Sequence, residues 1–304
     1  MAKWLWGEIM EKHYPSKLLL FGEHSVLRGS QALAVPFEQF SGKWAYSDDF
    51  SKQMDLSKWL DYLKKLSQKG EIALDTEGVQ RELKNGLFFD SNIPRGYGAG
   101  SSGALVAALY DIFGLNKELS INDLKKILGK IESFFHGSSS GLDPLVSYIQ
   151  KGILIKKDKT IIALEGVQSD AQMFLLDTHQ PRKTEPLVNL FVKKCETNTQ
   201  YNVLIENELV PYVDDAVAVF LQNRTTELFD LVHKISYFQY RFFPEMIPLA
   251  FKNVWLEGLA SDTFKLKLCG AGGGGYILGF CNNFVDAKKE LSKLGFIVLP
   301  ITSV

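Results

Sequence analysis

A glycine-rich stretch that runs into a helix-forming segment is the part of this sequence that points most directly to chemistry. It reads Pro94-Arg95-Gly96-Tyr97-Gly98-Ala99-Gly100-Ser101-Ser102-Gly103 and is followed by residues 104–110, rich in Ala and Leu. The glycines permit positive φ angles and a close approach of the backbone to a ligand. Unpaired N–H groups and partial positive charge at a helix N-terminus favour phosphate. The stretch therefore predicts a phosphate-binding loop, against the alternative of a flexible turn before a buried helix.

Two common phosphate loops fit this stretch poorly. Residues 98–103 match the dinucleotide pattern G-x-G-x-x-G, but that motif needs a strand directly before it and an acidic residue at the end of a second strand about 20 residues on. Pro94 interrupts the approach, and Asn122-Asp123 reads as the start of a helix. A Walker motif needs Gly-Lys-Ser/Thr after the glycines, and none follows.

Phosphoryl transfer needs a phosphate cradle, a magnesium site, an oriented hydroxyl and a cation near the transferred group. Ser102 and Glu132 offer the oxygen ligands that Mg²⁺ prefers. Asp143 is a candidate base for the acceptor hydroxyl, and Lys17 can stabilise charge on the phosphoryl group. Each has an ordinary alternative: a helix cap for Ser102, a solvated position for Glu132 and Lys17, and an N-cap before Pro144 for Asp143.

Further candidates can bind an acceptor. His24 is either a core histidine or a hydrogen-bonding group for a substrate. Arg182 and Lys183 can pair with a carboxylate or belong to the charged surface. The run 270–275 holds five glycines and one alanine before a strand at 276–280. So much glycine indicates that a ligand or another part of the chain comes close, against the alternative of a floppy hairpin loop.

Local patterns predict the elements that position these residues. In the first half we expect strands at 18–21 and 32–35 and a helix over 55–69. A helix over 120–135 begins with a capping box at Ser120, and the next helix begins at Pro144. In the second half we expect strands at 171–177, 263–268 and 276–280, the strand 263–268 being half exposed, and helices near 186–199, 202–221 and 224–237. We place a domain boundary near residue 168, giving domains 1–168 and 169–304.

Composition restricts the class of protein. The 304 residues are 46% hydrophobic, and 34 basic residues balance 35 acidic ones to a net charge of −1. We expect no nucleic-acid partner and no membrane partner, and no apolar run is long enough to span a membrane. Cys195, Cys269 and Cys281 are too few for a disulfide framework, and we interpret them as reduced thiols in a cytoplasmic protein.

Three separated motifs resemble those of the GHMP kinases, in particular the mevalonate kinase branch of that superfamily. Residues 15–29, Pro-Ser-Lys-Leu-Leu-Leu-Phe-Gly-Glu-His-Ser-Val-Leu-Arg-Gly, resemble the first motif, P-G-K-x-x-L-F-G-E-H-A-V-x-x-G. Residues 94–103 resemble the second, P-x-x-x-G-x-G-S-S-A, with Gly103 in place of alanine. Residues 267–275 resemble the third, K-x-T-G-A-G-G-G-G, with Cys269 in place of threonine. Residues 132–143 match the pattern E-x-x-x-H-G-x-x-S-G-x-D, and 181–184 resemble P-R-S-T.

The resemblance implies an α+β fold of two domains. The N-terminal α/β domain binds the nucleotide, the C-terminal domain is ferredoxin-like, and the active site lies in the cleft between them. It also implies residue roles. Asp143 and Lys17 are catalytic, Ser102 and Glu132 bind magnesium, and residues 94–103 wrap the ATP phosphates. The substrate-binding positions, which include Lys17, are Glu23, His24, Arg182, Thr184, Gly270, Ala271 and Gly272.

The resulting hypothesis is transfer of the γ-phosphoryl group of ATP, with Mg²⁺, to the primary hydroxyl of mevalonate. Gly22-Glu23-His24 favours this acceptor within the superfamily. The alternatives are a GHMP kinase for another small hydroxylated substrate, such as phosphomevalonate or a sugar, a protein that senses ATP without turnover, and a dinucleotide-dependent oxidoreductase. The expected partner is a small-molecule substrate. The oligomeric state stays open, with a homodimer as one candidate.

Overall fold

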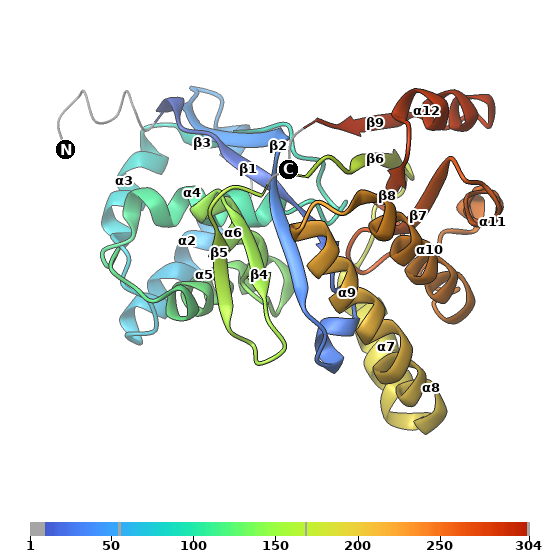
Figure 1. The fold of residues 1–304 in the computed structure, drawn as a ribbon. Helices are drawn as coiled ribbons and strands as arrows, with labels where there is room; N and C mark the ends of the chain where they lie inside the picture. Colours follow the sequence, from blue (N-terminus) through green and yellow to red (C-terminus); the bar gives the residue numbers. More distant parts are fainter. Residues whose placement is uncertain (1–9, 54–55, 168, 303–304) are drawn as a thin grey trace. The chain divides into compact units, whose positions relative to one another are not determined.

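Two units account for the part of the chain that the computed structural model describes, residues 10–53, 56–167 and 169–302 (Figure 1). Unit 1 holds the chain up to Lys17, Pro36–Pro94 and Gly100–Lys151, and unit 2 holds Leu18–Val35, Arg95–Ala99 and the chain from Gly152 onward. The chain thus passes between the units several times. A single domain boundary near residue 168 stays a prediction, and residue 168 itself lies outside the described residues.

The elements follow one another in a mixed order of strands and helices. The strands are β1 (Tyr14–Phe21), β2 (Ala32–Tyr46), β3 (Leu87–Ser91), β4 (Gly152–Ile155), β5 (Ile161–Leu164), β6 (Gln172–Asp177), β7 (Phe264–Leu268), β8 (Tyr276–Cys281) and β9 (Val298–Ile301). The α-helices are α2 (Leu56–Gln68), α3 (Thr76–Lys84), α4 (Ser101–Phe113), α5 (Ile121–His136), α6 (Leu142–Ile149), α7 (Thr184–Thr197), α8 (Thr199–Leu204), α9 (Val210–Leu221), α10 (Thr225–Phe242), α11 (Lys252–Ala260) and α12 (Phe284–Lys293). Short helical turns are η1 (Ser25–Arg28), η2 (Phe50–Gln53), the π-helical η3 (Ile205–Leu209) and η4 (Leu249–Phe251).

Two sheets organise these strands. In the first, the order is β1-β2-β4-β5, and β3 pairs with β2. Within unit 1 residues 42–46 of β2 pair antiparallel with β3, and within unit 2 residues 32–34 pair antiparallel with β4. The second sheet lies wholly in unit 2, with the order β7-β8-β6-β9 and antiparallel neighbours throughout.

A cluster of three helices, α4, α5 and α6, forms the centre of unit 1, where each helix contacts the other two. Small residues bring their backbones close: a Cβ added at Gly129 of α5 would lie 3.2 Å from the Cα of Gly141, just before α6. The Ser120 side chain accepts the N–H of Asp123 and caps α5, as the capping box predicted. The Trp59 indole donates to the Ile131 carbonyl at 3.3 Å and ties α2 to α5. The cluster is therefore a rigid base for side chains at the helix ends.

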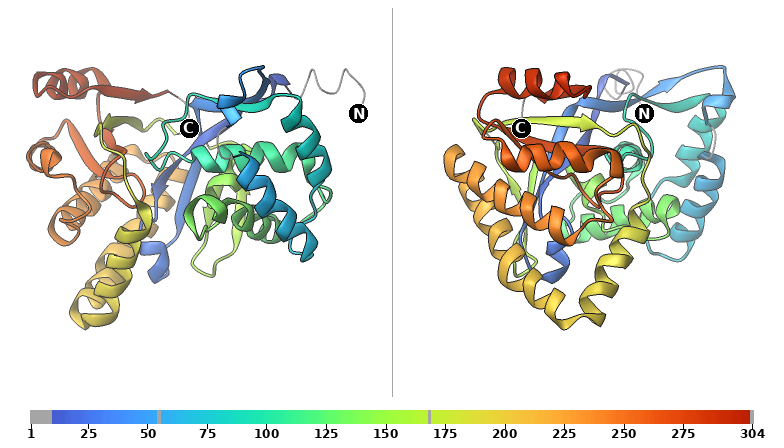
Figure 2. Two further views of the ribbon diagram at one scale, coloured as in Figure 1. Left: turned by 180° about the vertical axis from the view of Figure 1, so that it is seen from behind. Right: turned by 90° about the vertical axis from the view of Figure 1, so that its right-hand side faces the viewer.

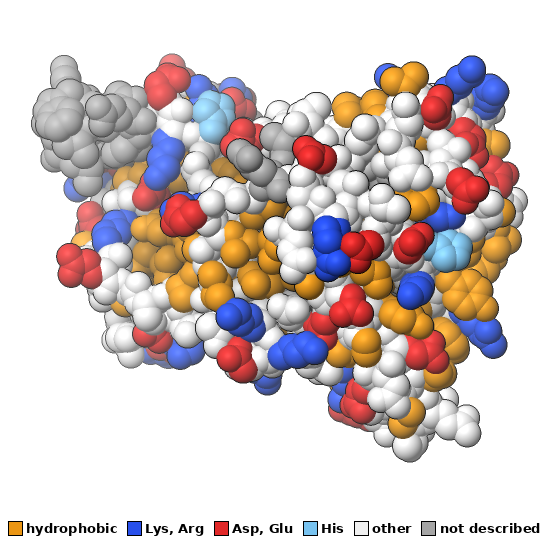
Figure 3. Space-filling view, in the orientation of Figure 1, with side chains coloured by type: hydrophobic (Ala, Val, Ile, Leu, Met, Phe, Trp, Pro, Cys, Tyr) orange, Lys and Arg blue, Asp and Glu red, His pale blue; other side chains and the backbone are white. Residues whose placement is uncertain are grey.

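Helices also pack on the sheet of unit 2. Helices α10 and α11 contact β7, and α12 contacts β9 and β6 (Figures 1 and 2). Aromatic side chains fill the spaces between them: Phe174 and Phe264 lie 6.4 Å apart by ring centroid, and the buried Trp255 indole donates to the Ser236 carbonyl. On the face drawn in Figure 3, acidic and basic side chains are intermixed without a large area of one sign. None of the described helices is long and apolar enough to cross a membrane.

The structure corrects three local predictions. The first strand begins at Tyr14, so Lys17 lies inside β1 and not in a loop before it. Asp143 is not an N-cap, because Gly141 takes that position with φ +72° and Asp143 lies in the first turn of α6. The strand β7 is buried along its whole length and not half exposed. Its Lys265 donates to carbonyls at the end of α11, and Lys267 contacts Glu23, which is why basic residues occur inside this strand.

Candidate functional site

The start of α4 has the geometry that the phosphate-loop prediction requires. Gly100 is the N-cap with φ +82°, and Ser101 and Ser102 are the first helical residues. A left-handed backbone at this position favours glycine. No side chain caps the helix, so the first N–H groups keep their capacity to bind an anion.

The structure accounts for the glycine at position 103, where the related motif has alanine. An added Cβ would lie 2.8 Å from the backbone carbon and from the Cβ of Asp143, and 2.9 Å from the nitrogen of Pro144. The first turn of α4 therefore touches the first turn of α6 where Asp143 is located. Glycine permits this contact.

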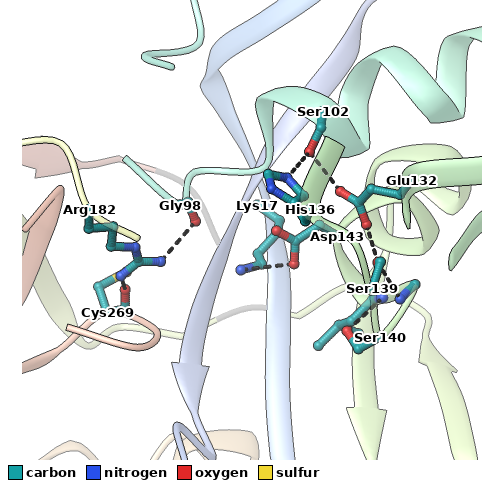
Figure 4. Close-up of polar contacts among 12 residues, drawn as sticks. Lys17, Gly98, Ser102, Glu132, His136, Ser139, Ser140, Asp143, Arg182 and Cys269 are labelled. Carbon is teal, nitrogen blue, oxygen red and sulfur yellow. Dashed lines mark hydrogen bonds and ion pairs between the residues drawn. The ribbon is translucent and has the colours of Figure 1, made fainter. Parts of the chain in front are cut away.

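A hydrogen-bonded network connects the two predicted magnesium ligands (Figure 4). The Ser102 hydroxyl donates to Oε1 of Glu132 at 2.8 Å and lies 2.9 Å from Nε2 of His136. The other carboxylate oxygen, Oε2, accepts the hydroxyl of Ser139. Glu132 is only 4% exposed although it is a carboxylate. Ser102 comes from the first turn of α4 and Glu132 from the last turns of α5, so the packing of these two helices sets the geometry.

Lys17 and Asp143 form an ion pair in the same unit. Nζ of Lys17 lies 3.0 Å from Oδ1 of Asp143, and the side chains are 8% and 28% exposed. Ser16, which replaces a glycine of the related motif, is buried and donates its hydroxyl to the Phe37 carbonyl at 2.9 Å. The hydrogen bond of Ser16 thus holds strand β1 in place directly beside Lys17. The carboxylate of Asp143 remains partly exposed to solvent.

The oxygen donors of unit 1 fit magnesium. Burial, together with the nearby Asp143 carboxylate, raises the pKa of Glu132 to about 7, although hydrogen bonds from the hydroxyls of Ser139 and Ser102 and the charge of Lys17 oppose this shift. A divalent cation would relieve the same repulsion. Mg²⁺ usually takes one or two carboxylates together with phosphate oxygens and water. Among the described residues no group of three or more His, Cys, Asp or Glu side chains is placed to hold a metal alone.

In unit 2, Arg182 connects two glycine-rich segments. Its guanidinium donates to the Cys269 carbonyl at 2.7 Å and to the Gly98 carbonyl at 3.3 Å (Figure 4). A Cβ at Gly98 or Gly270 would lie 1.7 Å or 2.6 Å from Nη2 of Arg182. The glycines of both segments therefore make room for one side chain, which answers the prediction that another part of the chain comes close to residues 270–275.

Glu23 and His24 form a second polar group inside unit 2. Oε1 of Glu23 contacts the ammonium of Lys267, and both side chains are buried. Burial lowers the pKa of Lys267 to about 7. Nε2 of His24 lies 3.1 Å from the Ala271 carbonyl, and its ring packs on Phe191. Oε2 of Glu23 and Nδ1 of His24 are buried and have no hydrogen-bond partner among the described residues, so hydrogen-bonding capacity is left unused at both atoms.

The backbone at His24 is unusual. It has φ +59° and precedes the turn η1, a conformation that costs energy for any residue with a Cβ. Burial lowers its pKa to about 4, so the ring is neutral at physiological pH and presents one donor and one acceptor nitrogen.

The predicted site residues thus fall into two sets, one in each unit. Lys17, Ser102, Glu132 and Asp143 belong to unit 1, where an ion pair links Lys17 to Asp143 and a hydrogen bond links Ser102 to Glu132. Residues 95–99 and 270–272, together with Glu23, His24, Arg182 and Thr184, belong to unit 2. Thr184 begins α7 and is exposed, as is Arg95, while Pro94 is half-buried at the end of a unit 1 segment. Their roles stay predictions.

Sequence reasoning assigned no role to Ser139 or Lys267. Ser139 lies at a position that the matched pattern leaves open, so only its hydroxyl and its spacing of seven from Glu132 hinted at a contact. The alternation of apolar and basic residues in β7 predicts that Lys267 is half exposed. A lysine three residues before a dense glycine loop is the available signal, but its partner Glu23 is 244 residues away.

Comparison with known proteins places this geometry in a family context. Residues 61–151, which hold α4, α5 and α6, match the family described as GHMP kinases N terminal domain. Over 168 residues the chain is 32% identical to a mevalonate kinase of Thermococcus onnurineus (strain NA1), covering 44% of this chain and 48% of the relative. Over 313 residues it is 25% identical to a mevalonate kinase of Pyrococcus furiosus, covering 88% of each. For the mevalonate kinases that are about 30% identical to this chain, the matched region spans about half the length of each relative.

Solved structures extend the likeness over the whole fold. The mevalonate kinase of L. major in complex with R-mevalonate has a TM-score of 0.65 at 15% identity, covering 96% of this chain and 95% of that chain. The phosphomevalonate kinase of Streptococcus pneumoniae in complex with phosphomevalonate and AMPPNP has a TM-score of 0.67 at 16% identity, covering 95% and 98%. These comparisons confirm the resemblance drawn from the motifs and the expected α+β fold.

Proposed function

We propose that this chain, which carries the N-terminal domain and the fold of the GHMP kinases, transfers the γ-phosphoryl group of ATP to the primary hydroxyl of mevalonate, giving 5-phosphomevalonate. The observation that carries this proposal is the pairing of Lys17 with Asp143 at 3.0 Å, in the same unit as the Ser102–Glu132 hydrogen bond. Phosphoryl transfer is mainly positioning and charge stabilisation, and these four residues supply the groups for both.

Asp143 would act on the acceptor. Its carboxylate is partly exposed, and Lys17 holds one oxygen. The carboxylate accepts the proton of the acceptor hydroxyl as the oxygen attacks the γ-phosphorus and the bond from that phosphorus to the ADP oxygen breaks. The Lys17 ammonium then faces both the new acid and the transferred phosphoryl group, where it stabilises negative charge.

The α4 N-terminus and the Ser102–Glu132 pair would act on the nucleotide. The N–H groups that follow Gly100 bind phosphate oxygens. When bound by Ser102 and Glu132, Mg²⁺ supplies positive charge that neutralises the phosphates. The oxygen donors and the raised pKa of Glu132 support this assignment.

Mevalonate is the acceptor favoured by sequence similarity, since the curated relatives are named mevalonate kinases. The Glu23 and His24 atoms that lack partners among the described residues are suited to a hydroxylated acid. A second acceptor class is kept because the fold is shared with a phosphomevalonate kinase, at a TM-score of 0.67, and with a galactokinase of Lactococcus lactis, at 0.63. The three cysteines are free thiols, in agreement with the proposed cytoplasmic location.

A coupled assay of ADP release with ATP, Mg²⁺ and mevalonate tests the proposal, with the product identified by mass spectrometry. Phosphomevalonate and galactose are assayed in parallel. Turnover of mevalonate alone supports the proposal. Turnover of another acceptor in its place contradicts the substrate but not the reaction class. Nucleotide binding without ADP release, with any acceptor, would indicate a sensor of ATP.

A further inference from the structure

Ser139 links the Glu132 carboxylate to the loop that precedes Asp143. Its hydroxyl donates to Oε2 of Glu132, and Oγ of Ser139 accepts the N–H of Gly141 at 3.0 Å. Gly141 is the N-cap of α6, the helix that carries Asp143 in its first turn. One hydroxyl therefore connects the buried carboxylate of α5 to the loop that sets the position of the proposed base (Figure 4).

The surroundings leave this connection little freedom. Gly141 has φ +72°, and an added Cβ would lie 2.1 Å from the Lys125 carbonyl oxygen of α5. The loop before α6 is thus pressed against the α5 backbone. Because the backbone is fixed on both sides, the direction of the Ser139 hydroxyl is fixed as well.

The two oxygens of Glu132 are consequently not equivalent. Oε1 shares its hydrogen bond with Ser102 at the α4 N-terminus, and Oε2 is occupied by Ser139. A carboxylate held at one oxygen by a hydroxyl donor cannot rotate freely about its last torsion. Oε1 is then the oxygen that stays next to Ser102 and is available to a cation.

We propose that Ser139 is a positioning residue for Glu132, which orients Oε1 toward the cation shared with Ser102. This inference rests on the proposed function, since it takes the Ser102–Glu132 pair as the Mg²⁺ site. It concerns a residue that the matched family pattern leaves unspecified. Outer hydrogen-bond partners of metal ligands typically change metal affinity by 10- to 100-fold when they are removed.

The test compares Ser139→Ala with two variants and the wild-type protein. Ser139→Thr keeps a hydroxyl at the position. Ser133→Ala makes the same chemical change on α5 next to Glu132, but the Ser133 hydroxyl donates to the Gly129 carbonyl at 2.8 Å and not to Glu132. Each protein is titrated into Mn²⁺ with AMPPNP, and bound Mn²⁺ is measured by electron paramagnetic resonance. Binding of AMPPNP without metal is measured separately, together with thermal unfolding.

We expect Ser139→Ala to bind Mn²⁺ about tenfold more weakly, with unchanged affinity for metal-free AMPPNP. Ser139→Thr and Ser133→Ala should remain within about threefold of wild type, since neither change removes a donor to Glu132. Equal metal affinity in Ser139→Ala and wild type would overturn the inference and leave the proposed function intact. Equal losses in Ser139→Ala and Ser133→Ala would also overturn it, because they would indicate a general loosening of α5. Absence of Mn²⁺ binding by the wild-type complex would contradict the proposed metal site itself, and the inference with it.

Discussion

Two lysine–carboxylate pairs, one in each unit, use the same functional groups in different surroundings. Lys17 and Asp143 in unit 1 are 8% and 28% exposed, whereas Lys267 and Glu23 in unit 2 are 0% and 1% exposed. The first pair leaves a carboxylate that solvent or a substrate can reach. The second pair is sealed, and one of its oxygens has no partner among the described residues. The two pairs therefore differ in exposure and not in the identity of their groups, and the greater exposure of Asp143 suits the reactive role proposed for it.

Asp143→Asn should have the largest effect. The amide cannot accept a proton, so we expect kcat to fall by about 10²- to 10⁴-fold. Binding of AMPPNP and the unfolding midpoint should change little because Asn keeps the size of the side chain. Steady-state ADP release measures the loss. A variant with near wild-type kcat would remove Asp143 from the proposed chemistry.

Lys267→Met tests the sealed pair. It leaves the carboxyl group of Glu23 buried without its partner, and we expect the free energy of unfolding to fall by about 3–5 kcal/mol. The matched change Lys17→Met leaves Asp143 partly hydrated, so the loss of stability should stay below about 1 kcal/mol while activity falls. Urea denaturation of both variants gives the comparison. Equal destabilisation by the two changes would refute the distinction between the pairs.

The pH dependence of stability tests the burial of His24, the neighbour of Glu23. Its pKa is lowered from 6.5 to about 4, so the unfolded state binds a proton more readily than the folded state between these values. The stabilisation is therefore present above pH 6.5 and is lost as the pH falls through 4. At 1.36 kcal/mol per pKa unit the loss is roughly 3 kcal/mol.

The control for this measurement is His24→Asn, because asparagine tolerates a positive φ angle well. Urea denaturation from pH 7 to 4 should show a shallower decrease in stability for the variant than for the wild type. Parallel curves would mean that the imidazole of His24 is free to protonate in the folded protein.

Gly103→Ala should have the smallest effect, and it acts on Asp143 of the more exposed pair. Alanine favours a helix by about 1 kcal/mol over glycine, but the added Cβ would lie 2.8 Å from Asp143 atoms. We expect the crowding to offset the gain, with a net loss of roughly 0–2 kcal/mol and a fall in kcat of up to about tenfold, 1.36 kcal/mol in activation free energy, as Asp143 moves. Thermal unfolding and kcat are measured together. A more stable variant with full activity would contradict this prediction, because it would show that α4 and α6 can accommodate the added Cβ without loss of stability or of kcat.

The local signals in the sequence predicted much of this structure. The Ser120 capping box, the glycine loop before α4 and the apolar stripe of α5 depend on neighbouring residues, and these elements are present with small shifts at their ends. The predictions are wrong where the contact that determines a residue's surroundings comes from a distant part of the sequence. Alternation in β7 predicts a half-exposed strand, but the acceptors of its lysines come from α11 and from Glu23.

Asp143 shows the same limit at a helix start. An Asp-Pro pair is typical of an N-cap and first helical residue, yet Gly141 forms the cap and the carboxylate is paired with Lys17. The helix cap lies two residues before the position that the local pattern predicts, and the carboxylate pairs with Lys17, which is far away in the sequence. The residues around Asp143 in the sequence could indicate it as a candidate base. Only the packing of α4, α5 and α6 determines which atoms its carboxylate contacts.

The hydrogen bonds of Arg182 have a consequence for ligand binding within unit 2. Its guanidinium joins the Gly98 and Cys269 carbonyls, and its own backbone N–H donates to the Gly96 carbonyl at 2.7 Å. Three segments that are distant in the sequence are therefore joined through Arg182. A ligand that orders any one of them lowers the conformational entropy still to be lost by the other two. Cooperativity between ligands would then arise from shared stiffness, without any displacement visible in an average structure.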